Sequence, residues 1–129
     1  MDRSTAPELE RLADTLWAER HVVELLLYRL TVAKLMLAAD ERRFVSLAIG
    51  EVEEAVDSLR EAELRRETAI AALADVWDMD PDKLTLGDLA ERAPEPFASV
   101  LADHREGFRK LTEEIEATAG ENESAWSSP

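Results

Sequence analysis

Residues 22–37, VVELLLYRLTVAKLML, hold twelve apolar residues in a run of sixteen. A helix that packs against one partner needs an apolar stripe only about two residues wide in each heptad. A second partner, from this chain or from another protein, must therefore cover the rest of this segment. A membrane is excluded as that partner, because Glu24, Arg29 and Lys34 spread charge around the helix and the run is shorter than the roughly 20 residues that a span needs.

In each of two long segments, mostly apolar residues recur at spacings that alternate between three and four. Their positions are 9, 12, 16, 19, 23, 26, 30, 33 and 37 in the first run and 45, 49, 52, 56, 59, 63, 66, 70, 73 and 77 in the second. This heptad spacing is typical of helices that pack along a seam. Because only the polar segment 40–43 separates the runs, the sequence predicts an all-α fold built on a long, coiled-coil-like antiparallel hairpin.

The hairpin register follows if facing residues have numbers that sum to about 82. Leu30 then lies opposite Val52, and Leu26 opposite Val56. The other predicted pairs are Leu37 with Val45, Val23 with Leu59, Leu12 with Ile70 and Leu9 with Leu73. The polar interruptions of the two seams also coincide, which predicts a charged layer in which Glu19 lies beside Glu63 and is neutralised by Arg20 or Arg66.

Helix boundaries come from capping and breaking residues. Thr5 and Pro7 predict the start of the first helix, and Pro81 ends the second within residues 75–83. Thr85 with Asp88 forms a capping box for a short helix over residues 86–92. A last helix should run from about residue 96 to 119 and pack on the hairpin, with Gly120 as its stop.

Length, charge and cysteine content limit the class of protein. The 129 residues suit a single helical domain over residues 1–120, with an acidic tail, residues 121–129, that we expect to be disordered. The net charge of -14 disfavours nucleic acid and anionic lipid as partners and suits a binder of proteins. The absence of cysteine and of an N-terminal apolar segment predicts a cytoplasmic protein without disulfides.

No pattern of a catalytic or metal site is complete. Residues 78–82, DMDPD, begin like a calcium loop, but Lys83 and Leu89 occupy the positions of its glycine and glutamate, so a turn is favoured. Neither histidine has a glutamate three residues before it, as a di-iron bundle requires, and His104 falls on the apolar seam of the last helix. We therefore expect no enzyme activity, cofactor or metal.

Several segments, in this order and spacing, resemble the FlgN-type flagellar export chaperones in their actinobacterial form. The similarity covers about residues 9–117. It rests on residues 16–20 (LWAER), 25–30 (LLLYRL), 35–39 (LMLAA), 59–65 (LREAELR) and 93–97 (APEPF), with Leu101, His104 and Arg105. The turn at residues 41–44 departs from the family pattern, in which a glycine is expected.

The resemblance implies a cytoplasmic chaperone that holds hook-associated proteins, the hook-filament junction subunits, before type III export, with the export gate as a further partner. It assigns client binding to the C-terminal region. The partner-binding residues on that basis are Phe97, Leu101, Phe108, Leu111, Ile115 and Trp126. Our hypothesis is that the last helix exchanges between packing on the hairpin, over the apolar face of residues 22–37 that the second helix leaves uncovered, and packing on the client. Permanent packing against residues 22–37 is the alternative.

A function of another class also fits the heptad pattern. A static coiled-coil scaffold or oligomerisation module without a client would use the same seams to associate with itself. The chain is compatible with a monomer or a homodimer under either function.

Overall fold

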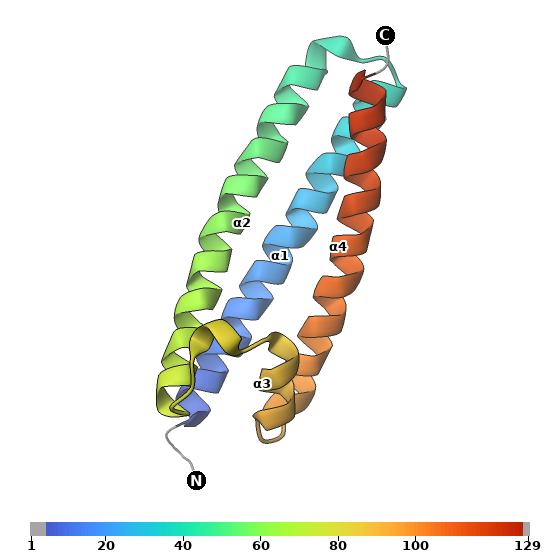
Figure 1. Ribbon diagram of the computed structural model, residues 1–129. Coiled ribbons are helices and arrows are strands. Elements are labelled where there is room, and N and C mark those ends of the chain that lie inside the picture. The colour runs from blue at the N-terminus through green and yellow to red at the C-terminus, as the bar shows by residue number, and fades with distance from the viewer. Residues whose placement is uncertain (1–4, 128–129) are drawn as a thin grey trace.

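The computed structural model describes residues 5–127, with side chains up to residue 120. It confirms the all-α prediction over this range (Figure 1). The helices are α1 (Ala6–Ala38), α2 (Arg42–Val76), α3 (Leu86–Arg92) and α4 (Phe97–Ser127), and a single 3-10 turn, η2 (Pro81–Lys83), precedes α3. The long helix α1 lies between α2 and α4, antiparallel to α2 and parallel to α4, while η2 and α3 sit at one end of the bundle.

Aspartate takes the place of glycine at the C-terminal ends of both hairpin helices, α1 and α2. Asp40 after α1 and Asp78 after α2 adopt left-handed backbone conformations, with φ of 56° and 54°. The following N–H groups, of Glu41 and Met79, each donate to a carbonyl five residues earlier at 2.9 Å. These are the bonds of a Schellman motif, which aspartate tolerates better than most side chains do. The hairpin turn therefore needs no glycine.

The predicted register of the hairpin is confirmed for four of its six pairs. Leu26 and Leu30 of α1 share a cluster with Val52 and Val56 of α2, and Leu9, Leu12, Ile70 and Leu73 meet in a second cluster nearer the N-terminus. On α1 the buried residues are those that the heptad pattern selects: Leu9, Leu12, Leu16, Glu19, Val23, Leu26, Leu30 and Ala33.

On α2 the predicted seam is partly wrong. The structure buries Ala48, Ala55, Ala62 and Ala69, one heptad apart, whereas the predicted Ile49, Val56, Glu63 and Ile70 are only half-buried. Small side chains allow the backbones of α1 and α2 to approach closely, and this moves the bulkier neighbours one position around the helix, to the edge of the interface. Of these edge residues, Ile70 packs against the cluster at the end near α3.

The C-terminal helix is longer than the sequence predicts. Helix α4 does not stop at Gly120 but continues to Ser127, so residues 121–127 of the predicted tail are helical. A glycine inside a helix costs only about 1 kcal/mol, and the next proline is at position 129, so nothing after Gly120 forces an end. Residues 128–129 lie outside the described chain.

One end of the bundle is closed by η2 and α3. Leu84, Leu89 and Ala93 are buried there with Leu101 of α4 against the first turns of α1. The predicted capping box of α3 is present: Asp88 N–H donates to the Thr85 hydroxyl at 3.0 Å, and Thr85 N–H donates to the Asp88 carboxylate at 3.1 Å. None of the described helices is both long and apolar enough to cross a membrane.

If the alanine heptad sets the α1–α2 distance, enlarging one alanine should destabilise the fold. We expect Ala62→Leu to lower the free energy of unfolding by about 1–3 kcal/mol, because the added volume must separate tightly packed helices. Urea denaturation followed by circular dichroism measures this. Ala71→Leu, at an exposed position of the same helix, is the matched control and should change stability by less than about 0.5 kcal/mol. Equal effects of the two substitutions would contradict the proposed role of the alanines.

Candidate functional site

The three long helices do not form a closed bundle. Both α2 and α4 pack on α1, but among the described residues no Cα atom of α2 comes within 8 Å of one of α4. At the end nearest the N-terminus, α3 and η2 cover the space between α2 and α4. Toward the hairpin turn, no described element lies over this space.

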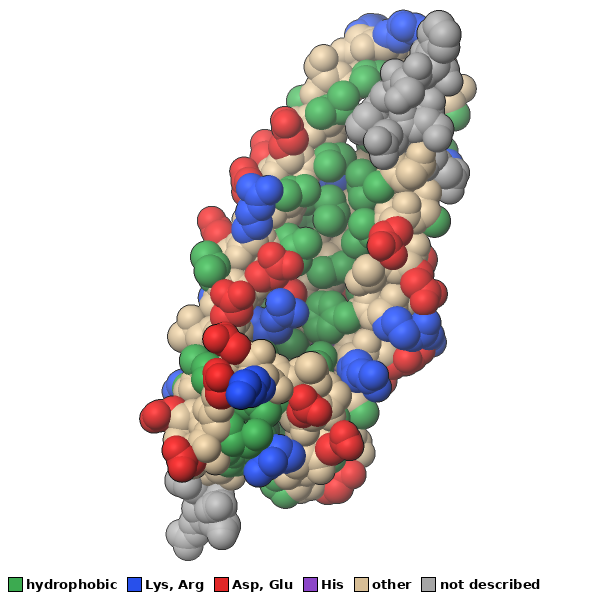
Figure 2. All heavy atoms as spheres, viewed as in Figure 1, with side chains coloured by type: hydrophobic (Ala, Val, Ile, Leu, Met, Phe, Trp, Pro, Cys, Tyr) green, Lys and Arg blue, Asp and Glu red, His purple; other side chains and the backbone are tan. Residues whose placement is uncertain are grey.

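An apolar strip is exposed in the uncovered half, between α2 and α4 (Figure 2). We call this strip the open groove. It is lined by Leu26 and Leu30 of α1, Val52, Val56, Leu59 and Ala55 of α2, and Ile115 and Ala119 of α4. The residues from α1 and Ala55 are buried, whereas those on the edges are half-buried. The open groove therefore presents partly accessible apolar side chains of α2 and α4 beside a buried floor from α1.

A charged layer ends the open groove on the side of α3. Glu19 is 2% exposed, and its carboxylate lies 3.2 Å from the Arg66 guanidinium. This confirms the predicted layer and assigns its cation to Arg66 rather than to Arg20. Burial raises the pKa of the Glu19 carboxyl, an effect that Arg66 opposes and Glu63 reinforces. Glu19 Oε1 is buried without a hydrogen-bond partner among the described residues.

Arg20 instead joins α1 to α4. Its Nη1 lies 3.2 Å from Nδ1 of His104 and 3.7 Å from the carboxylate of Asp103, and its guanidinium stacks over the Trp17 ring at 5.0 Å. A Cβ atom added to Gly107 would lie 2.5 Å from Arg20 Nη2. The Arg20 guanidinium thus lies directly against the backbone of Gly107.

His104 is a packed core histidine, consistent with its place on the apolar seam. It is 1% exposed, and the edge of Trp17 meets its ring with the centroids 4.8 Å apart. Burial lowers the pKa of His104, and the charge of Arg20 lowers it further, against a smaller opposing effect of Asp103. The neutral ring can accept the Arg20 hydrogen bond at Nδ1, which a protonated ring could not.

The predicted partner-binding residues separate into two groups. Leu101 is fully buried at the closed end, and Phe97 and Phe108 are half-buried against the same cluster. Ile115 lines the open groove, and Leu111 is half-buried on the seam between Phe108 and Ile115. The side chain of Trp126 lies outside those described.

Sequence reasoning missed most of the open groove. The heptad pattern assigns Val52, Val56 and Leu59 to the hairpin seam and so predicts that they are buried, as Leu26 and Leu30 are, whereas the structure leaves these three half-buried. The alanines at intervals of seven in α2 were the available signal. They mark the helix face that contacts α1, which moves the β-branched residues beside them to an accessible edge.

The expectation that the last helix covers the remaining apolar face of residues 22–37 is wrong. Leu25, Tyr28 and Leu35 stay 40%, 57% and 61% exposed, because α4 packs on the side of α1 that carries Trp17 and Arg20. Phe44 and Leu47 of α2 are exposed as well, and a shallow pocket of about 270 Å³ lies between Val32, Met36 and these two residues. This outer face is distinct from the open groove.

The described residues include no group of three or more His, Cys, Asp or Glu side chains arranged to hold a metal ion. In the segment that begins like a calcium loop, the Asp80 carboxylate accepts a hydrogen bond from Asp82 N–H at 3.0 Å and caps η2. Comparisons with protein-family models, with curated proteins and with solved structures find no match for this chain.

Removing the cation of the charged layer should leave Glu19 buried without its partner. We expect Arg66→Met to lower the free energy of unfolding at pH 7 by about 1–3 kcal/mol, given that Arg66 is itself one-third exposed. The double variant Glu19→Met/Arg66→Met should regain most of that loss, because no buried charge remains. Urea denaturation of both variants tests this, and a double variant no more stable than Arg66→Met would contradict it.

The lowered pKa of His104 gives stability a defined pH dependence. The unfolded chain, in which His has a pKa of about 6.5, binds this proton more readily than the folded protein does. The contribution of His104 is therefore present above about pH 6.5 and is lost as the pH falls, by at most about 1.4 kcal/mol per pH unit. Between pH 5 and 8, the free energy of unfolding should fall more steeply with decreasing pH for the natural protein than for His104→Gln. Parallel profiles would rule out this role for His104.

Proposed function

We propose that this protein is a cytoplasmic export chaperone of the FlgN type, which binds and masks the terminal helices of hook-associated proteins before type III export. The observation that carries the proposal is the open groove: two helix walls and a helix floor, all lined by apolar residues, with no described element in the fourth position of a bundle toward the hairpin turn. The sequence resemblance supplies the class of client.

One amphipathic helix would complete the bundle in the open half. At the other end, η2 and α3 already occupy the space between α2 and α4, so a client helix would lie end to end with them along the same gap. Its apolar stripe would contact Val56 and Leu59 on one wall and Ile115 on the other, over Leu30. This is the helix-in-groove mode of recognition, and it removes from water a stripe that would otherwise aggregate.

The packing of α4 favours a client that binds beside this helix rather than one that displaces it. Leu101 and His104 are buried, and Arg20 lies against Gly107 and hydrogen-bonds His104, so the first turns of α4 belong to the closed end. Releasing the whole helix would open that core. Helix α4 therefore serves as one wall of the site, with Ile115 as its contact residue, and Leu101 has a structural role.

The alternative function, a scaffold or oligomerisation module without a client, draws support from the outer face. Leu35 and Leu47 are each more than 60% exposed there. A scaffold of this kind would associate with itself constitutively through that face. Its size in solution would then change on substitution of Leu47, and it would not bind flagellar junction proteins.

The two functions are separated by paired substitutions to aspartate. We expect Val56→Asp, in the open groove, to reduce binding of a hook-associated protein in a pull-down by at least roughly tenfold, because a charge would be buried against the client helix. Leu47→Asp, on the outer face, should leave binding unchanged. Circular dichroism and thermal unfolding check that both variants remain folded, and Ile115→Asp provides a second groove variant. Loss of binding in Leu47→Asp alone, or no binding by the natural protein, would overturn the proposal.

A further inference from the structure

The charges along the open groove indicate the chemistry of its occupant. Resting on the proposed function, we propose that the groove takes an amphipathic helix whose apolar stripe is flanked by lysine or arginine. The interaction surface thus selects clients by charge as well as by apolar contact.

Unpaired carboxylates lie along both rims. Glu53 follows Val52 on α2, and Glu116 follows Ile115 on α4, so each is next to a groove-lining residue and exposed. Glu67 is exposed near the end where the groove meets η2. None of these three carboxylates forms an ion pair with another described residue. Each is free to pair with a cation of a bound helix.

Three arginines near the groove are already paired with carboxylates of the protein. Arg66 is paired with buried Glu19 at 3.2 Å, and Arg60 is 3.9 Å from Asp57. Arg109 lies between two carboxylates, of Glu106 and Glu113, at 2.6 Å each. The uncompensated charge of the rims is therefore negative, in agreement with the net charge of -14 for the whole chain. A helix flanked by acids would be repelled, and one flanked by bases attracted.

The length of the floor sets the length of the occupant. The buried positions of α1 beyond the Glu19 layer run from Val23 to Ala33. At about 1.5 Å per residue this is about 16 Å, or three helical turns. A peptide of about 18 residues therefore covers the groove with one turn to spare at each end.

Two synthetic peptides of that length, with the same apolar stripe but flanked by lysine in one and glutamate in the other, test the proposal against the full-length protein. At low salt we expect the lysine peptide to bind about tenfold more tightly than the glutamate peptide, since two or three partly exposed ion pairs together add binding free energy of this order. The difference should shrink as sodium chloride is raised, because salt screens exposed charges.

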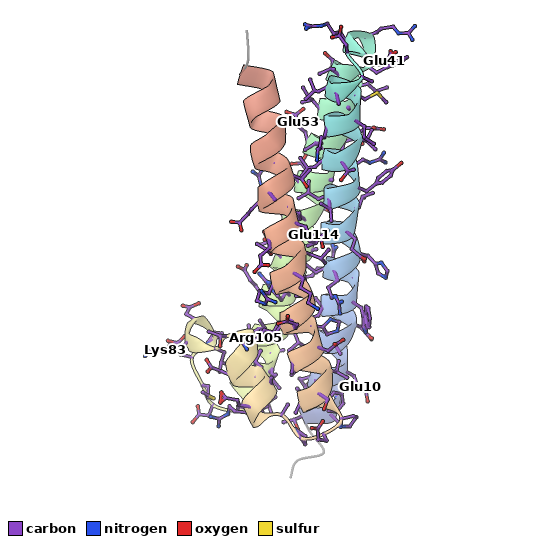
Figure 3. All side chains as sticks on the ribbon, turned by 90° about the vertical axis from the view of Figure 1, so that its right-hand side faces the viewer. Glu10, Glu41, Glu53, Lys83, Arg105 and Glu114 are labelled. Atoms are coloured by element: carbon purple, nitrogen blue, oxygen red, sulfur yellow. The ribbon has the colours of Figure 1, made fainter. Side chains whose placement is uncertain are left out.

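A matched pair of variants distinguishes the effect of charge at the groove rim on peptide binding from the effect of net charge. Glu53 and Glu10 point to opposite sides of the bundle (Figure 3), and both are exposed. Glu53→Lys should weaken binding of the lysine peptide about threefold, whereas Glu10→Lys, with the same change in net charge, should have no effect. Equal effects of the two variants would overturn the assignment of selectivity to the groove rim.

The outcomes distinguish this inference from the proposed function. If both peptides bind equally and Val56→Asp abolishes both, the groove binds helices but the charge selection is wrong. If neither peptide binds at any salt concentration and a hook-associated protein is also not retained, the groove is not a helix-binding site and both proposals fail.

Discussion

The structure depends on one helix having an apolar stripe wide enough for two partners. The buried residues of α1 contact α2 and α4 at once: Leu9, Leu12 and Leu16 at the closed end, and Leu26 and Leu30 at the open end. Because α2 and α4 do not approach each other, every long-helix interface passes through α1. The relative positions of the two groove walls are therefore fixed only by how each packs on α1 and, at one end, by α3.

Much of the hairpin could be predicted from the sequence, because heptad spacing and short turns are local constraints. The pairing of Leu30 with Val52 and the charged layer at Glu19 followed from matching two seams. Which face of α2 is turned toward α1 did not follow from the sequence. Val56 and Ala55 are both apolar, and only the tertiary contact decides which of them is buried. The side of α1 on which α4 packs was also not predictable, because α1 has two apolar faces and only tertiary contacts, among them the hydrogen bond between Arg20 and His104, show which face α4 covers.

The two ends of the bundle differ in how firmly their elements are held. At the closed end, leucines from α1, α2, α3 and α4 are fully buried together, and the capping box of α3 and the hydrogen bond from Arg20 to His104 add directional contacts. At the open end, the described residues of α4 beyond His104 are at most half-buried. Directional polar contacts at one end and partly exposed apolar residues at the other are the arrangement expected when one half maintains the fold and the other half binds.

This division bears on the affinity for a client. If a client had to displace α4, its apparent affinity would be reduced by the free energy needed to expose Leu101 and His104, both of them almost completely buried. A client that enters the open groove meets walls already held in place, and only its own ordering opposes binding. On the proposed function, the acidic side chains at the rims keep this accessible apolar surface soluble in the free protein and would also favour a basic helix as the client. Solubility of the empty groove and selection of its occupant would then depend on the same carboxylates.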